Sequence, residues 1–125
     1  MTLSPAERAA IDERSARKIQ HVIAAQLNLI LAYHGAGTAE AAKVAQKQED
    51  LFYLSHHARQ CMETARECAT TAPDLALGAA NNCHAALLEV AQIAKETTAQ
   101  LDAILNSQRQ AIILALEESA KANPR

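Results

Sequence analysis

Potential metal ligands are concentrated in the middle of the chain, in the stretches HHARQCMETAREC (residues 56–68) and NNCHAALLEV (residues 81–90). Cysteine sulfur and histidine nitrogen are the ligands that zinc prefers in tetrahedral protein sites. The residue types therefore suggest either a metal or redox site or a set of small side chains in a packed core. The residues concerned are His56, His57, Cys61, Cys68, Cys83 and His84.

The spacing of these residues predicts one zinc-type arrangement. His57 and Cys61 are four residues apart, so they share one face of a helix. A short turn around Ala72–Pro73 would make the flanking segments antiparallel, with Cys61 facing Cys83 and His84 beside it. The predicted metal site consists of His57, Cys61, Cys83 and His84.

The cysteines also suit a simpler role as packing residues. Cysteine is among the most buried residue types and packs as a small hydrophobe. The sequence has no CxxC, HExxH or CxxCH motif, and a Cys61–Cys83 disulfide is disfavoured in a reducing compartment. We therefore expect the cysteines to pack in the core and keep the zinc site as the alternative.

Other catalytic chemistry has no support in the residue pattern. A di-iron bundle needs paired Glu-x-x-His motifs, and no glutamate here has a histidine three residues later. The chain also has no glycine-rich phosphate loop and no GxSxG motif. We expect a protein that is not an enzyme and has no cofactor.

Composition indicates an all-α fold with small core residues. The chain of 125 residues is 50% hydrophobic but only 2% aromatic, with three glycines and three prolines, and much of its apolar content is alanine. Alanine is the strongest helix former and buries little area per residue. The sequence predicts one domain, residues 1–125, built as an antiparallel bundle of three long helices.

Capping signals place the first two helices at about residues 5–34 and 39–70. Ser4, Pro5 and Glu7 form a capping box with a proline at the first helical position. Gly35 or Gly37 is expected to end the first helix, and Thr38 to cap the second, which stops before Pro73.

The third segment is predicted as one helix over about residues 72–121. Apolar residues recur at three- and four-residue steps without losing phase, so the helix would be about 70 Å long. A new cap at Thr97 or Thr98 would instead divide it and give a four-helix bundle. The longer helix is preferred, and its apolar face would extend beyond what two helices of about 45 Å can cover.

Charge and hydropathy limit the classes of partner and the cellular location that the sequence predicts. With 12 basic and 14 acidic residues mixed along the chain, no basic patch predicts nucleic-acid binding. The longest apolar run is too short for a transmembrane segment, and the charged N-terminal stretch does not resemble a signal peptide. An odd number of cysteines also argues against a secreted disulfide framework, so we expect a cytoplasmic protein.

Two regions are predicted to contact partners. Phe52 and Tyr53 must lie partly outside the narrow apolar face of their helix, either against the flank of the first helix near His21 or as anchors for a partner. Near the C-terminus, apolar residues surround more than half of the helix, which predicts self-association. The residues predicted to make this contact are Ile112, Ile113 and Leu116.

In its alanine- and glutamine-rich composition the chain resembles small helical assembly proteins, such as phasins, which coat polymer granules, and the subunits of R-bodies. The resemblance covers composition alone and implies a role in assembly. The function predicted from the sequence is a non-enzymatic helical scaffold or interaction protein. It would form homo-oligomers or bind another helical protein through apolar faces, and a small zinc-binding bundle is the alternative.

Overall fold

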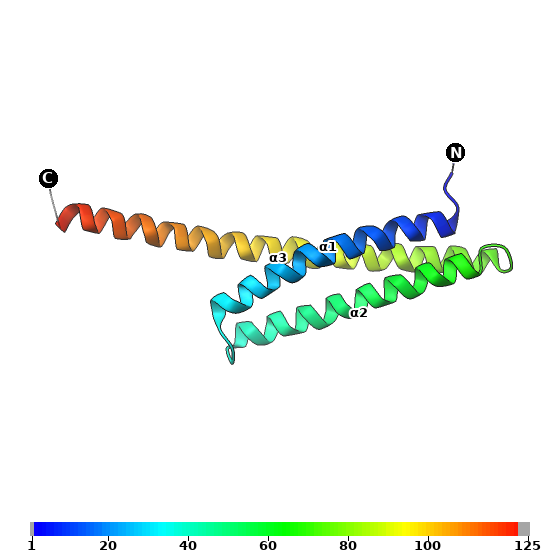
Figure 1. Cartoon of the computed structure of the whole chain (residues 1–125), viewed down its shortest axis with the longest axis horizontal. Helices are drawn as coiled ribbons and strands as arrows, with labels where there is room; N and C mark the ends of the chain where they lie inside the picture. The colour runs from blue at the N-terminus through cyan, green and yellow to red at the C-terminus, as the bar shows by residue number, and fades with distance from the viewer. Residues whose placement is uncertain (1, 123–125) are drawn as a thin grey trace.

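The computed structural model describes residues 2–122 as three antiparallel helices, α1 (Pro5–His34), α2 (Ala39–Glu67) and α3 (Pro73–Ala122). All three helices pack against one another along the length of α1 and α2 (Figure 1). The all-α class and the three-helix bundle predicted from the sequence are confirmed. Among these residues, no helix is both long and apolar enough to cross a membrane.

The helix ends follow the capping chemistry of the sequence. The Ser4 hydroxyl accepts a hydrogen bond from the backbone N–H of Glu7, and the Glu7 carboxylate accepts one from the N–H of Ser4. Gly35 and Gly37 both have a φ of 84°, a conformation that glycine adopts without steric cost. Thr38 then caps α2 by accepting from the N–H of Ala41.

The end of α2 differs slightly from the prediction. The helix stops at Glu67 and not at residue 70, because the chain turns through Cys68–Ala72 before Pro73 begins α3. In that turn the N–H of Ala72 donates to the carbonyl of Cys68. A residue that precedes proline is disfavoured in the helical conformation, so the turn needs several non-helical residues.

The core changes in character along the bundle. Near the α2–α3 turn it consists of small side chains, which let the three backbones approach closely; these are Ala9, Ala58, Cys61, Ala65, Ala79, Ala80, Cys83 and Ala86. Toward the α1–α2 turn it consists of larger aliphatic side chains, namely Ile23, Leu27, Ile30, Val44, Leu51, Leu54 and Val90.

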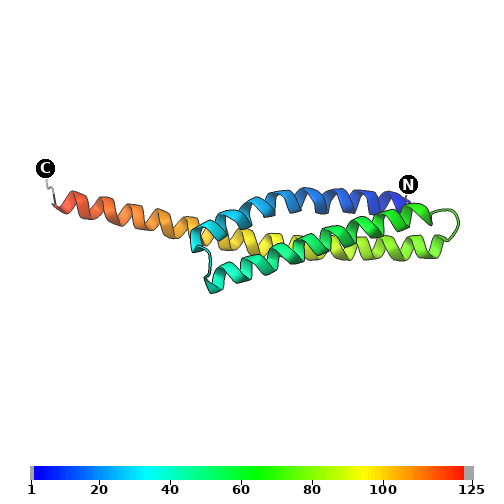
Figure 2. The same ribbon diagram turned by 60° about the horizontal axis from the view of Figure 1, so that its bottom comes forward.

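α3 is a single continuous helix, so the division near Thr97 does not occur. It contains 50 residues, whereas α1 and α2 contain 30 and 29. At about 1.5 Å per residue, α3 is about 75 Å long and extends well past the α1–α2 turn (Figure 2). The last half-buried residue of α3 is Ile104. Residues 105–122, called the arm below, are all exposed.

Candidate functional site

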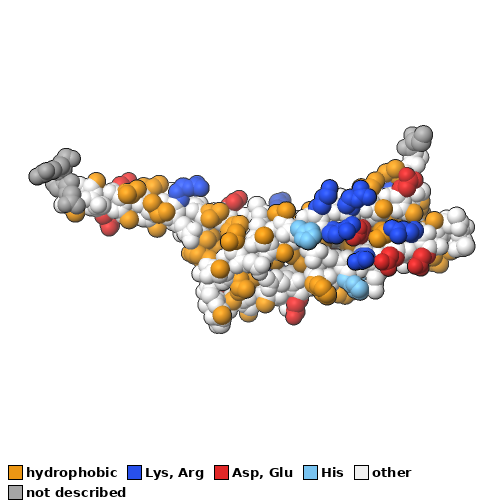
Figure 3. All heavy atoms as spheres, viewed as in Figure 1, with side chains coloured by type: hydrophobic (Ala, Val, Ile, Leu, Met, Phe, Trp, Pro, Cys, Tyr) orange, Lys and Arg blue, Asp and Glu red, His pale blue; other side chains and the backbone are white. Residues whose placement is uncertain are grey.

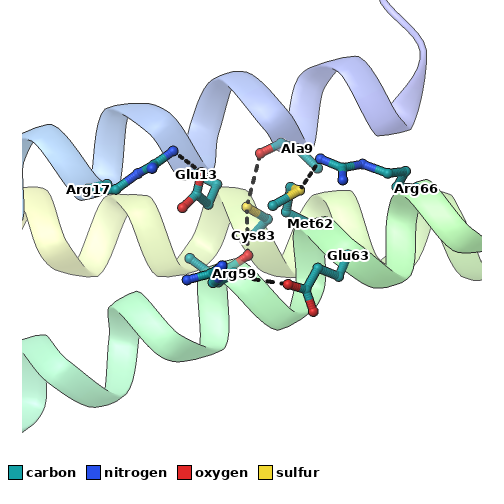
Figure 4. Close-up of polar contacts among 9 residues, drawn as sticks. Ala9, Glu13, Arg17, Arg59, Met62, Glu63, Arg66 and Cys83 are labelled. Atoms are coloured by element: carbon teal, nitrogen blue, oxygen red, sulfur yellow. Dashed lines mark hydrogen bonds and ion pairs between the residues drawn. The ribbon is translucent and has the colours of Figure 1, made fainter.

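The structure brings two of the four predicted zinc ligands together. The Nε2 atom of His57 lies 3.6 Å from the Sγ atom of Cys61, one turn along α2. Cys83 instead packs in the centre of the bundle, where its Sγ lies 3.5 Å from the carbonyl oxygens of Ala9 and Ala58 (Figure 4). Both carbonyls can accept from the thiol, so Cys83 contacts the backbones of α1 and α2 at once.

The two histidines of the predicted site line different grooves. His84 lines a groove between α1 and α3, where its Nδ1 lies 3.1 Å from Oδ2 of Asp12. His57 lines a groove between α2 and α3 and stacks on the ring of Tyr53, with centroids 6.1 Å apart. Within residues 2–122, no three histidine, cysteine or acidic side chains are grouped so as to hold a metal ion. The zinc site therefore stays a prediction, which the metal content of the purified protein would test.

The remaining members of the cluster lie apart from this pair. His56 is exposed and lines a groove between α1 and α2, whereas Cys68 is half-buried at the C-terminal end of α2. All three cysteines are free thiols in the structure. The arrangement thus spreads the potential ligands over the centre of the bundle and several of its faces.

The environment of the buried thiols keeps them protonated. Burial raises the pKa of the Cys61 thiol. Burial, followed by the nearby carboxylate of Asp12, raises the pKa of Cys83 from 9.0 to about 11. Because the thiolate is the reactive and metal-binding form, these shifts disfavour both nucleophilic chemistry and metal coordination at neutral pH.

Phe52 and Tyr53 are both highly exposed, at 71% and 67%. Phe52 lies in a groove between α1 and α2 whose lining includes Arg17 and Gln20 of α1. Tyr53 lies on the other side of α2, in the groove with α3. The two adjacent rings therefore face different sides of the bundle, and each is available to a partner.

The arm exposes several large apolar side chains, and hydrophobic atoms lie along it in Figure 3. Its large side chains are 42–66% exposed, the set being Leu105, Ile112, Ile113, Leu114 and Leu116. Exposed large side chains contiguous in this way commonly mark an interaction site. The arm is therefore the strongest candidate for a functional surface.

One face of the arm continues the core-facing side of α3. From the buried Thr97 and the half-buried Leu101, steps of three and four residues lead into a line that we call the seam. The seam consists of Leu105, Gln108, Ile112, Ala115, Ser119 and Ala122. Leu116 lies beside it, whereas Leu114 lies on the opposite face of the helix.

Sequence reasoning missed two polar features. It did not pair His84 with Asp12, because these residues are far apart in the chain and no local motif links them. It considered Thr97 as a helix cap, but Thr97 is fully buried within α3, and its hydroxyl has no hydrogen-bond partner in the described part of the chain.

Comparison with known proteins found no family model, no curated protein and no solved structure that matches this chain.

Proposed function

We propose that the protein is a non-enzymatic helical scaffold that self-associates through the apolar surface of the α3 arm. The observation that carries the proposal is the length of α3 relative to its partners. Residues 73–104 pack against α1 and α2, but residues 105–122 are all exposed although they contain five large aliphatic side chains.

The energetics of the arm support a partner. Because residues 105–122 are all exposed, the bundle contributes little tertiary stabilisation to the helical conformation of the arm, which is about 27 Å long. The hydrophobic effect contributes about 25 cal/mol for each Å² of apolar surface buried. Covering the arm therefore stabilises both its helical conformation and the complex.

The small-residue core supports the same conclusion. Half of the bundle is held together mainly by alanine and cysteine side chains, which bury less apolar area than leucine or isoleucine. Association adds stability to a folded chain because a partner that binds only the native state shifts the folding equilibrium. A scaffold of this kind gains stability as it assembles.

The native mass tests the proposal, measured by light scattering over a range of protein concentrations. We expect the wild-type protein to be a dimer or larger, with a mass that falls on dilution. The double variant Ile112→Gln/Leu116→Gln should shift the dissociation constant at least tenfold toward the monomer, because both side chains lie on or beside the seam.

A matched control separates this effect from a general loss of hydrophobicity. Leu88→Gln/Leu114→Gln removes two side chains that are each 57% exposed, close to the 62% and 66% of Ile112 and Leu116. Leu88 lies on the bundle and Leu114 on the outer face of the arm, so this variant should associate like the wild type. A wild-type protein that is monomeric at every concentration would contradict the proposed function.

Phe52 and Tyr53 are proposed as a second contact region on the body of the bundle. Aromatic side chains dominate many interface energies, and these two rings are the most exposed large hydrophobic side chains of α2. Phe52→Ser should leave the native mass unchanged if the arm alone drives self-association, and should lower it if the bundle body takes part.

A further inference from the structure

We propose that the arms of two copies pair antiparallel along their full length, with each seam covered by the other. This inference rests on the proposed function, because it names the partner and the geometry of the same surface. Three features of the structure lead to it: the direction of the seam, the position of the α1–α2 turn and the order of residue sizes along the arm.

The direction of the seam fixes where the partner helix must lie. The seam continues the side of α3 that α1 and α2 cover as far as Ile104. A helix that covers the seam therefore occupies the space directly beyond the α1–α2 turn at residues 35–38, roughly in line with α1 and α2 (Figure 2). The uncovered surface is thus an extension of the bundle core.

The α1–α2 turn excludes a parallel partner. In a parallel pair, the second α3 would continue past Leu105 toward residue 73, on the side where the first molecule already has α1 and α2. The two bundles would then occupy the same volume. In an antiparallel pair, each bundle lies next to residue 122 of the other arm, so neither bundle obstructs the pairing of residues 105–122.

The α1–α2 turn limits the register as well as the direction. Full overlap of residues 105–122 of the two copies brings the partner's Ala122 beside Leu105, the first residue past the bundle. A shift of seven residues toward the bundle would push the partner's helix into the α1–α2 turn. A shift of seven residues away from it would withdraw the described part of the partner's helix from Leu105.

The residues along the seam agree with this register. Leu105 meets the partner's Ala122, and Ile112 meets the partner's Ala115, so each large side chain faces a small one. Gln108 meets the partner's Ser119, which lets the two polar side chains hydrogen-bond to each other. A shift of seven residues toward the bundle would instead place Gln108 against the partner's Ile112 and leave its amide without a polar partner.

Disulfide cross-linking between two single-cysteine proteins tests the pairing. Cys61, Cys68 and Cys83 are first replaced by alanine, and circular dichroism checks that the helical content and melting temperature are retained. Gln108→Cys is then introduced in one protein and Ser119→Cys in the other. On mild oxidation of the mixture, we expect the cross-linked heterodimer to form at least tenfold faster than either self-linked dimer.

The geometry of the antiparallel pair explains that difference. Residue 108 lies opposite the partner's residue 119, whereas two copies of residue 108 are 11 residues apart along the helix, about 16 Å. A mixture of Gln110→Cys and Lys121→Cys is the matched control, because both positions lie on the outer face of the arm with a similar separation. This mixture should cross-link no faster than free thiols in solution.

Each outcome has a definite meaning. Rapid self-linking of Ser119→Cys would show a parallel pair and overturn the inference while leaving self-association intact. A dimer by light scattering without cross-links between residues 108 and 119 would also overturn it, by placing the interface elsewhere. A monomer at all concentrations would instead contradict the proposed function itself. If the alanine replacements unfold the chain, peptide mapping of the same cross-links with the native cysteines present gives the same test.

Discussion

At the scale of single residues, Cys83 shows how the bundle uses a cysteine as a small packing group. Its sulfur contacts carbonyl oxygens of both neighbouring helices, and the side chain is fully buried. The sequence predicted a packing role from the residue type and its alanine-rich surroundings. It could not predict that His84, the next residue, turns toward Asp12 of α1, because the rotation of α3 about its axis depends on the packing of all three helices.

The raised pKa of Cys83 predicts a loss of stability in alkaline solution. Burial raises this pKa from 9.0 to about 11, so the folded state favours the neutral thiol. The stabilisation is fully present below pH 9 and is lost as the pH rises through 9 toward 11, because the unfolded chain loses this proton first. We expect the free energy of unfolding to fall by on the order of 2 kcal/mol over that range from this group.

Chemical denaturation of wild type and Cys83→Ala at pH 8, 9 and 10.5 measures this effect. The variant lacks the titrating thiol of residue 83, so its free energy of unfolding should decline less steeply as the pH rises. Parallel declines in the two proteins would contradict the assignment to Cys83.

At the scale of the helices, the boundaries of α1 and the start of α2 follow from local sequence, whereas the continuity of α3 does not. Capping side chains act within a few residues, so Ser4, Glu7 and Thr38 identify their helix ends directly. Thr97 and Thr98 allow either a continuous helix or a new cap. Packing decides between them, because Thr97 enters the core and Thr98 donates to Gln26 of α1.

Thr97→Val is predicted to stabilise the protein by about 1 kcal/mol. The Thr97 hydroxyl is buried and has no hydrogen-bond partner among residues 2–122, and valine replaces it with a methyl group of similar size. The control Thr98→Val removes the hydrogen bond of 3.0 Å to Gln26 at an exposed position and should be neutral or destabilising. Thermal unfolding measures both variants, and a melting temperature of Thr97→Val below that of the wild type would contradict this interpretation.

At the scale of the whole molecule, the sequence predicted the fold class, the number of helices and the excess length of α3. These features follow from the recurrence of apolar residues every three or four positions, a pattern that can be found within each helix separately. The predicted zinc site required four particular side chains, from two helices, to converge on one point. The structure joins only His57 and Cys61, because Cys83 is directed into the core and His84 toward α1.

The extended shape also predicts a modest affinity. Two paired arms of about 27 Å give an interface near the lower end of stable protein interfaces, about 1,000 Å². The native mass should therefore depend on concentration over the micromolar range.

Amide hydrogen exchange of residues 105–122, measured by mass spectrometry at several protein concentrations, tests most directly whether a second copy covers the arm. We expect these amides to be protected at high concentration and to exchange progressively faster on dilution, while the amides of residues 76–97 stay protected throughout. Two results would contradict the pairing of the arms. One is that the arm amides exchange at the rate of an unfolded peptide at every concentration. The other is that they are equally protected at every concentration in a protein shown to be monomeric.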